Sequence, residues 1–493
     1  MSYQIVIPMT GVGQRFVDAG YKNLKPLIEV AGKTIVEHVL GMFAGAGKVI
    51  CIISAEHEQR ESLASEILRI RPDAKISQIP GHKLGPGYAI LQAKQDIDLT
   101  LPTLVSYCDW AGEWQVSEML LQLKDHSGSI LTYTGFHPHM MRSTKFAYVK
   151  KVENLVVEIQ EKEPFTSTPM EEEASSGCYG FSTGALLLES LSLQLERGES
   201  LNGEYYISLT YKNLLQRGHR VGTVMMSKFY QWGTPEDLQD WEYWNSAIQS
   251  LPGEKIEKLA VHNVILAAGL GTRIAEFASQ SKPNIEISGK RLWEYSAPAG
   301  ITFESNWIVT RDEVGISTRG KIQKVTIPFV TEGQAITAKI GIEKISDLSL
   351  APVNVLSSDN AFTPEIFSDA ASLTSRNQIV VWTSNRYPMA QLMPSQYAWI
   401  NTKLKKIIKK QPPPDFQDWQ LITGNFTFPN RDIALSLIQD LVTMNIRVNN
   451  EFYLDSLIEL AFNKNLNVAT VEVPNFIAIG IPEEYLIYKY FKK

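Results

Sequence analysis

A short glycine-rich segment near the start of the chain carries residue types that suit phosphate binding. Gly11-Val-Gly13-Gln-Arg15 follows an apolar run, and Lys25 stands a little further on in LKPL. Glycines allow a tight turn and let the backbone approach a ligand closely. Successive N–H groups at such a turn, with a helix N-terminus behind them, suit a phosphate chain. Arg15 adds a forked cation and Lys25 a point charge, so the segment predicts a phosphate site.

Two familiar glycine-loop motifs fit this segment less well. A dinucleotide-binding loop needs a third glycine, and Phe16 stands at that position. A Walker loop is excluded because no Gly-Lys-Ser/Thr follows at the required spacing. The same arrangement returns in the second half as Gly269, Gly271, Arg273 and Lys282, again without the third glycine. The recurrence favours phosphate binding over an ordinary strand–loop turn.

The repetition extends well beyond the loop. Five further blocks recur in the same order: 106–114 with 357–365, 146–159 with 397–408, 176–184 with 423–430, 202–209 with 449–456, and 229–238 with 476–485. Such ordered repetition predicts two copies of one domain, at 1–250 and 258–493. The polar stretch 251–258, which contains Pro and Gly, is the expected linker.

Apolar runs alternate with helix-period segments inside each copy. In the first copy, strands are expected at 4–9, 48–54, 103–108 and 129–135, and helices at 34–47, 58–70 and 113–126. This alternation predicts an α/β fold in which a mostly parallel central sheet is flanked by helices. Ligands of such Rossmann-like sheets bind at the carboxyl ends of the strands.

The segment PMTGVGQRF…KNLKPLIEVAGKTIVEHVL resembles the N-terminal signature of sugar-phosphate nucleotidylyltransferases, the nucleoside-diphosphate-sugar pyrophosphorylases. The later blocks extend the resemblance over most of 1–245, and 262–490 resembles the same family more weakly. The resemblance implies two tandem nucleotidyltransferase domains of the Rossmann-like, GT-A-like type. It further implies that a sugar-phosphate oxygen attacks the α-phosphate of a nucleoside triphosphate in line and that pyrophosphate leaves. Such chemistry depends on positioning and charge neutralisation.

The resemblance also assigns roles to individual residues. Arg15 matches the arginine that holds the β- and γ-phosphates, Lys25 the lysine near the α-phosphate, and Asp109 the aspartate that binds Mg²⁺. Gly11 and Gly13 match the loop glycines. The residues expected at the base and at the acceptor are, in chain order, Gln78, Gly85, Glu161, Lys162, Gly177 and Glu204.

One departure from the family pattern concerns the metal. The family has a second metal-binding Asp before the Thr-Pro-Glu-Asp segment, where this chain has Gln231 and its second copy has Ala478. A neutral Gln binds Mg²⁺ less strongly than a carboxylate. Either Asp109 and the nucleotide phosphates hold one metal, or another carboxylate substitutes. His137 and His139 suggest metal ligation, pocket polarity or a structural role, with no third ligand evident.

The second copy keeps the nucleotide end better than the acceptor end. Gly269, Gly271, Arg273 and Lys282 are expected to bind nucleotide, and Asp359 to bind metal. Glu451 matches Glu204, and Lys410 is the nearest match to Lys162. Three prolines stiffen the segment after Lys410, and no acidic residue matches Glu161. A second transferase with another substrate and a regulatory or structural copy both remain open.

Composition sets the remaining bounds. The 493 residues include 47 Lys and Arg against 53 Asp and Glu, so no basic excess indicates nucleic acid. Cys51, Cys108 and Cys178 form no metal-binding spacing and are expected to be free thiols. The sequence shows neither a signal peptide nor an apolar run long enough for membrane insertion, which predicts a cytoplasmic enzyme. Homo-oligomerisation is left open.

The sequence therefore favours transfer of a nucleoside monophosphate from a triphosphate to a sugar 1-phosphate, in nucleotide-sugar biosynthesis for capsular or other surface polysaccharide. Its partners would be a nucleoside triphosphate and a phosphorylated small-molecule acceptor. One alternative is a non-catalytic tandem nucleotide-binding scaffold. Another is a cytidylyltransferase that acts on a non-sugar phosphate.

Overall fold

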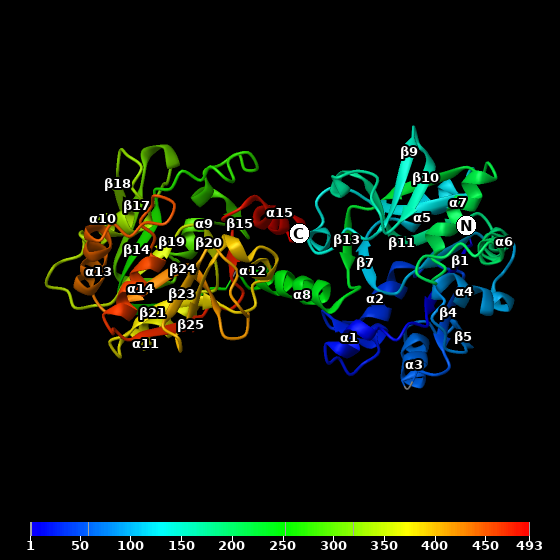
Figure 1. Cartoon of the computed structure of the whole chain (residues 1–493), viewed down its shortest axis with the longest axis horizontal. Coiled ribbons are helices and arrows are strands. Elements are labelled where there is room, and N and C mark those ends of the chain that lie inside the picture. The colour runs from blue at the N-terminus through cyan, green and yellow to red at the C-terminus, as the bar shows by residue number, and fades with distance from the viewer. Residues whose placement is uncertain (1, 58, 252, 319, 493) are drawn as a thin grey trace. The chain divides into compact units, whose positions relative to one another are not determined.

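A computed structural model describes residues 2–57, 59–251, 253–318 and 320–492. Glu58, in an expected helix, and Pro252, in the expected linker, lie outside the described residues. The chain divides into two compact units, Met1–Glu242 and Tyr243–Lys493, called here the N-terminal and C-terminal domains. Each contains one large sheet with helices packed against it (Figure 1). None of the described helices is long and apolar enough to cross a membrane.

The N-terminal domain is built on a nine-stranded mixed sheet in the order β10-β9-β11-β6-β1-β4-β5, with β8 and β12 paired beyond β11. Its strands are β1 (Gln4–Met9), β4 (Lys48–Ser54), β5 (Lys75–Ile79), β6 (Thr103–Ser106), β8 (Gly128–Tyr133), β9 (Ala147–Val152), β10 (Leu155–Glu161), β11 (Glu173–Phe181) and β12 (Val221–Met225). Strands β6, β1, β4 and β5 run parallel, whereas β11 is antiparallel to its neighbours. The α/β class with a largely parallel core is thereby confirmed.

Helices and short hairpins surround this sheet. The helices are α1 (Gln14–Asp18), α2 (Ile35–Met42), α3 (Arg60–Ile70), α4 (Gly85–Gln92), α5 (Val116–Gln122), α6 (Gly184–Glu196), α7 (Ile207–Gln216) and α8 (Pro235–Ser250). The hairpins are β2 (Glu29–Val30) with β3 (Lys33–Thr34), and β7 (Trp110–Glu113) with β13 (Lys228–Gln231). Every strand and helix expected in this copy is present, most of them shorter than the sequence pattern suggested.

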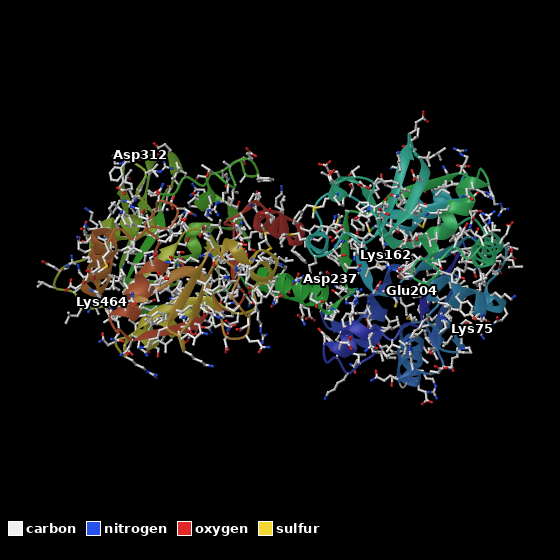
Figure 2. All side chains as sticks on the ribbon, in the orientation of Figure 1. Lys75, Lys162, Glu204, Asp237, Asp312 and Lys464 are labelled. Atoms are coloured by element: carbon white, nitrogen blue, oxygen red, sulfur yellow. The ribbon has the colours of Figure 1, made fainter. Side chains whose placement is uncertain are left out.

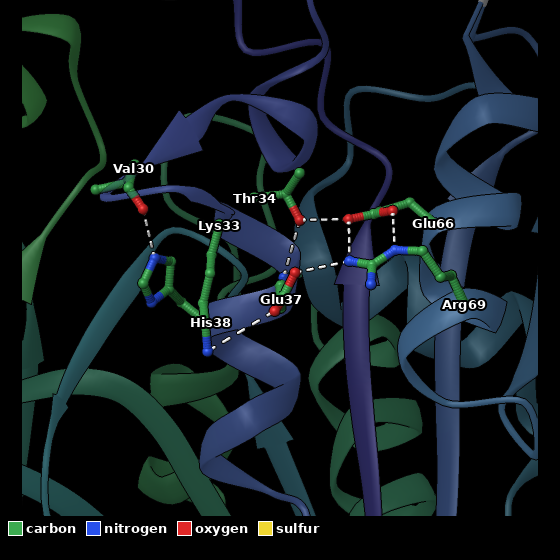
Figure 3. A network of polar contacts seen from close by, with 7 residues as sticks. All are labelled: Val30, Lys33, Thr34, Glu37, His38, Glu66 and Arg69. Atoms are coloured by element: carbon green, nitrogen blue, oxygen red, sulfur yellow. Dashed lines mark hydrogen bonds and ion pairs between the residues drawn. The ribbon is translucent and has the colours of Figure 1, made fainter.

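A polar network fixes the start of α2 after the glycine-rich loop (Figure 3). The Thr34 hydroxyl caps the helix by accepting a hydrogen bond from the Glu37 amide at 3.3 Å and donates to Glu66 on α3 at 2.9 Å. Arg69 on α3 donates to Glu37 at 2.7 Å and also pairs with Glu66. A hydroxyl cap of this kind contributes about 1 kcal/mol. The network therefore holds α2 and α3 together beside the loop.

The C-terminal domain repeats this topology strand for strand. Its large sheet has the order β18-β17-β14-β19-β24-β21-β25, with β22 and β23 attached to β24. The strands are β14 (Glu257–Ala267), β17 (Ile301–Thr310), β18 (Ile322–Thr326), β19 (Val353–Ser357), β21 (Ile379–Ser384), β22 (Ala398–Asn401), β23 (Lys406–Lys409), β24 (Gln420–Phe428) and β25 (Val468–Glu472). Strands β18, β17, β14 and β19 are parallel, as are their counterparts β5, β4, β1 and β6.

The remaining elements of the C-terminal domain follow the same plan. The helices are α9 (Leu292–Tyr295), α10 (Gln334–Ile342), α11 (Ile366–Thr374), α12 (Pro388–Leu392), α13 (Arg431–Thr443), α14 (Asp455–Asn463) and α15 (Pro482–Phe491). The two-stranded pairs are β15 (Glu286–Ile287) with β16 (Lys290–Arg291), and β20 (Asn360–Ala361) with β26 (Ile477–Ala478). No helix corresponds to α1, because residues 272–277 form turns.

The two domains also share a pattern of left-handed backbone conformations. The matched positions are Gly13 with Gly271, Ala31–Gly32 with Ser288–Gly289, Gly85 with Gly333, Lys162 with Lys410, Gly177 with Gly424, and Asn202–Gly203 with Asn449–Asn450. Positive φ is unfavourable for residues other than glycine, so its recurrence at matched places requires a common backbone path. The repeat read from the sequence is therefore a repeat of three-dimensional structure.

Candidate active site

The glycine-rich loop connects β1 to α1 at the carboxyl end of a fully buried strand. Gly13 has φ +71°, and a Cβ atom there would lie 3.2 Å from the Cβ of Lys25, so the loop packs closely on that lysine. At Gly11 a Cβ atom would meet no atom within 4 Å. The fold itself therefore requires glycine only at position 13. Phe16 is 2% exposed in the core, which explains why the third glycine of a dinucleotide loop is absent.

Lys25 and Asp109 form an ion pair at the carboxyl end of β6. The Lys25 Nζ donates to Asp109 Oδ2 at 2.8 Å and to the Gly233 carbonyl at 3.1 Å. The lysine side chain is 12% exposed and the aspartate 30%. The lysine ammonium suits phosphate oxygens of a ligand, and the partly exposed carboxylate suits a cation that accompanies them. The structure thus unites two site residues that are separated by 84 positions in the sequence.

Gln231 occupies the strand β13, which pairs with β7 directly after Asp109. The Trp232 amide donates to the Asp109 carbonyl at 2.8 Å, and a Cβ atom at Gly233 would lie 2.4 Å from Gln231 Nε2 and 3.7 Å from Asp109 Oδ2. The amide of Gln231 therefore lies beside the carboxylate. Within the described residues, no group of three or more His, Cys, Asp or Glu side chains is arranged to hold a metal.

Asp237 follows Glu236 in the first turn of α8 and is labelled in Figure 2. Burial raises the pKa of its carboxyl to about 6. It forms a hydrogen bond with the Thr234 hydroxyl at 2.9 Å at the start of α8. This contact caps the helix, and no bond joins Asp237 to Asp109 in the described chain. Among the described residues, no hydrogen-bond donor contacts the second carboxylate oxygen of Asp109.

Lys162 and Glu204, both labelled in Figure 2, each interact with Tyr206. Lys162 has a left-handed backbone with φ +61°, and its Nζ contacts the hydroxyl of Tyr206 and lies 4.2 Å from the ring centroid. Burial, and then a hydrogen bond with Glu204, raise the pKa of Tyr206 above its usual value. Tyr206 therefore connects Lys162 to Glu204. Its only signal in the sequence was its recurrence as Tyr453 in the matched block.

Glu161 precedes Lys162 at the end of β10. It accepts a hydrogen bond from the Ser208 hydroxyl, and burial raises the pKa of its carboxyl. Gly177 on β11 has φ +89°, and a Cβ atom there would lie 2.8 Å from the ring of Tyr107. Tyr107 is close enough to Glu161 for the charge of that carboxylate to raise the pKa of the Tyr107 hydroxyl, in addition to the larger effect of burial.

The turn around Gly85, which is expected to contact the base, packs on the segment that contains Glu204. Gly85 has φ +82°, and a Cβ atom there would lie 2.9 Å from the Tyr205 amide and 3.1 Å from Glu204 Cβ. The Tyr205 amide donates to the Leu84 carbonyl at 2.9 Å. Gln78, in contrast, is exposed on the edge strand β5 and forms no side-chain hydrogen bond within the described residues. The structure therefore brings Gly85, but not Gln78, into contact with another predicted site residue.

The two histidines belong to an aromatic cluster. The Tyr133 hydroxyl and His139 Nε2 are 3.0 Å apart, and the ring of His139 packs edge-to-face on Phe146 and Phe229. Burial lowers the pKa of His137 to about 4 and that of His139 well below its usual value. These neutral rings support the hairpin β7–β13, so the structural role is the one observed. All three cysteines are free thiols.

The C-terminal domain contains the same constellation. Gly271 has φ +66°, and its Cβ position lies 3.2 Å from Lys282 Cβ. Lys282 forms an ion pair with Asp359 after β19. Burial opposes ionisation of Asp359, but the charge of Lys282 and hydrogen bonds outweigh it and lower the pKa of the carboxyl. Arg273, Gly269 and Lys410 line the adjoining cavity.

A glycine-rich loop packed on Lys25 and a Lys–Asp pair at a strand end are features that suit phosphoryl chemistry on an α/β sheet. Residues 5–245 match the family described as Nucleotidyl transferase. The match spans almost the whole N-terminal domain and supports nucleotidyl transfer as the activity of that domain.

Several known proteins resemble the chain. A bifunctional protein GlmU from Burkholderia vietnamiensis is 26% identical over 356 residues, 71% of each chain. One from Alkaliphilus metalliredigens is 23% identical over 46% of this chain and 48% of its own. This chain thus spans about half to seven-tenths of these curated relatives. A solved nucleoside-diphosphate-sugar pyrophosphorylase from Vibrio cholerae is 21% identical, with TM-score 0.41, over 48% of this chain and 99% of its own.

Proposed function

We propose that the N-terminal domain transfers a nucleoside monophosphate from a nucleoside triphosphate to a sugar 1-phosphate or similar phosphorylated small molecule. An acceptor phosphate oxygen forms a bond to the α-phosphorus, the bond from that phosphorus to the β-phosphate oxygen breaks, and pyrophosphate leaves. The observation that carries this proposal is the Lys25–Asp109 ion pair beyond the end of β6, with Lys25 packed against Gly13 of the glycine-rich loop. The resemblance to sugar-phosphate nucleotidylyltransferases supports the class of acceptor.

Each proposed role follows from charge and position. Arg15 and the loop from Gly11 to Gly13 bind the departing β- and γ-phosphates. Lys25, at present neutralised by Asp109, donates to α-phosphate oxygens as negative charge builds up during displacement. Lys162 holds the acceptor phosphate, and its contact with Tyr206 fixes the ammonium on that side. The charges are thus positioned before the reaction begins.

The base and the acceptor have their own proposed contacts. Gly85 and Gln78 are proposed to contact the nucleotide base. Gly177, Glu161 and Glu204 are proposed to contact the hydroxyl groups of the acceptor. Mg²⁺, held by Asp109 and phosphate oxygens, would neutralise the charge of the triphosphate when bound. A cytoplasmic location and a place in the synthesis of nucleotide sugars for capsular or other surface polysaccharide complete the proposal.

The substitution Asp109→Ala tests this proposal. We expect pyrophosphate release to fall by at least ~100-fold, because the charge arrangement at the α-phosphate is lost while the exposed loop geometry remains. Release is measured with each of the four nucleoside triphosphates against a panel of phosphorylated acceptors. The matched variant Asp125→Ala, at an exposed position after α5, should react like the unaltered protein. Undiminished release by the Asp109 variant would contradict the proposed site.

A further inference from the structure

The C-terminal domain contains a cavity with two adjoining lobes. One lobe, of about 390 Å³, runs along the loop Gly269–Arg273 to the start of α10. The other, of about 170 Å³, extends to β23 and β24. The side chains and glycine shared by both lobes are Arg273, Gln334, Ser357, Asp359, Lys410, Tyr453 and Gly480. Because the lobes share a wall, one extended ligand can occupy both.

Two cations without carboxylate partners face this shared region. Arg273 is exposed and forms no ion pair with any described residue. The Lys410 Nζ donates to the Gln396 carbonyl at 2.7 Å and has no ion pair in the described chain. Burial and then the charge of Arg273 lower the pKa of Lys410, against a weaker opposite effect of Asp455 and Glu451. Two like charges directed at one space are relieved by a polyvalent anion.

The backbone of Lys410 gives independent support. Its φ is +55°, a conformation in which glycine is favoured over any other residue. Strained backbone positions of this kind cluster at ligand sites, and Lys410 lines the cavity. Lys162 has φ +61° at the matched place and contacts Tyr206, and in this domain Lys410 and Tyr453 line the same cavity. The C-terminal domain therefore keeps both the strained backbone and the cation.

The donor set beside these cations fits a divalent metal less well than the set in the N-terminal domain. Asp359 Oδ2 pairs with Lys282, and its Oδ1 accepts from the Ser357 hydroxyl. Both carboxylate oxygens are thus engaged, whereas the described residues of the N-terminal domain bond one oxygen of Asp109. Ala478 offers no ligand where Gln231 offers an amide. Positive charge for a bound anion must therefore come from the protein side chains.

We propose that the C-terminal domain binds the phosphate chain of a nucleoside triphosphate between Arg273 and Lys410 without needing a divalent cation. The larger lobe supplies Thr331, Gln334 and Thr337, whose hydroxyl and amide groups can bond the edge of a base. The chain thus holds a metal-independent nucleotide site in addition to the site proposed for transfer. The inference extends the proposed function, but its test measures nucleotide binding by the C-terminal domain and not transfer by the N-terminal domain. The inference and the proposed function can therefore fail independently.

Isothermal titration calorimetry of the full chain tests the inference. The probes are ATP, CTP, GTP, UTP and inorganic pyrophosphate, each titrated in excess EDTA and in Mg²⁺. In EDTA we expect one site per chain for at least one nucleotide. Its affinity should fall by about tenfold or more in Arg273→Ala, because a charge-assisted contact is lost. The matched variant Arg15→Ala should leave this affinity in EDTA unchanged.

The substitution Lys410→Gly separates binding from folding. Glycine relieves the left-handed backbone, so the midpoint of thermal unfolding should stay the same or rise while affinity in EDTA falls by about tenfold. A lower midpoint with unchanged affinity would show that Lys410 is structural and would overturn the proposal. Loss of all binding in EDTA, or weakening by Arg15→Ala in place of Arg273→Ala, would also overturn it. Pyrophosphate binding as tightly as every nucleotide would overturn the assignment of a nucleotide.

Discussion

At the level of single residues, the two glycines of the first loop have different physical reasons to be glycine. Gly13 has a left-handed backbone and packs on Lys25, whereas Gly11 faces open space. The fold thus explains Gly13, and only close approach of a ligand would require Gly11. The sequence motif alone assigns both glycines the same role, because it carries no information on the space around each Cβ position.

This difference predicts opposite effects of two similar substitutions. Gly13→Ala should destabilise the N-terminal domain by roughly 1–2 kcal/mol, because alanine is strained at φ +71° and contacts Lys25. Gly11→Ala should leave the free energy of unfolding within about 0.5 kcal/mol of the original and raise KM for the nucleoside triphosphate. Urea unfolding and steady-state kinetics measure the two effects. Equal destabilisation by both substitutions would contradict this interpretation.

The Lys25–Asp109 pair shows where sequence-based prediction stops at this scale. The sequence nominated both residues, but neither spacing nor residue type shows that they bond to each other. The contact depends on strand β6 ending beside the loop after β1, which is a property of the whole sheet. Tyr206 was missed for the same reason, since an aromatic residue in a helix-start segment is typical of a core position.

At the level of secondary structure, the predicted strands and helices were recovered because buried apolar runs determine them directly. Strand β1 is buried along its whole length, and β4 along nearly all of it. The ends of elements were less predictable, because capping contacts such as that of Thr34 terminate helices locally. The short helix α1 has no counterpart after Gly271, although the two loop sequences are similar.

Matched elements of the two domains carry reversed charges near the acceptor end. Glu161 closes β10, and the charge of Lys212 on α7 favours its ionised form. At the corresponding places, Lys409 closes β23 and bonds Glu459 on α14 at 2.6 Å. In both domains, oppositely charged residues thus lie on the strand and on the helix. The strand residue is acidic in the N-terminal domain and basic in the C-terminal domain, so the charge beside the pocket is reversed. The second domain therefore presents different chemistry on the same elements.

The aromatic cluster below the hairpin β7–β13 predicts a pH dependence of stability. The pKa values of His137 and His139 are lower in the folded than in the unfolded state, because burial disfavours the imidazolium. Below the ordinary pKa of about 6.5 the unfolded chain therefore binds more protons, and stability falls as the pH falls. Each histidine contributes a loss of up to about 1.4 kcal/mol per pH unit.

We expect His139→Gln, which keeps a hydrogen-bonding partner for Tyr133, to reduce this loss between pH 6.5 and 4. Urea unfolding of the full chain is measured at several pH values, with the unfolding transition of the N-terminal domain as the readout. The free energy of unfolding plotted against pH gives the slope. His126→Gln, after α5, serves as the matched control and should retain the original slope. An identical pH dependence in the His139 variant would show that the buried ring does not account for acid sensitivity.

At the level of the whole chain, the division between domains does not coincide with the polar stretch 251–258 that the sequence favours. The division falls after Glu242, within α8, and residues at the end of that helix belong to the C-terminal domain. Tyr243 donates to the Phe476 carbonyl at 2.8 Å, and the ring centroids of Trp244 and Tyr387 are 5.6 Å apart. Trp244 is 1% exposed. The Pro and Gly in a linker sequence could not reveal that the preceding helix packs on the next domain.

We therefore predict that a fragment 243–493 is more stable than a fragment 258–493. Removal of the two aromatic side chains uncovers Tyr387 and should cost roughly 3–5 kcal/mol in the free energy of unfolding. Urea unfolding of both fragments measures the difference. Tyr243→Phe in the longer fragment removes only one hydroxyl and should cost about 1 kcal/mol. Equal stability of the two fragments would place the domain boundary at the polar stretch.

The recurring left-handed positions limit how the two halves of the gene can drift apart. Mutations at Gly13, Gly85 and Gly177, or at their partners, meet a steric barrier in either half and are removed by selection for folding. Residues that line the pockets between these points meet no such barrier, as Glu161 and Lys409 illustrate. Divergence is thereby directed into ligand preference, and a second specificity can arise while the inherited backbone remains unchanged.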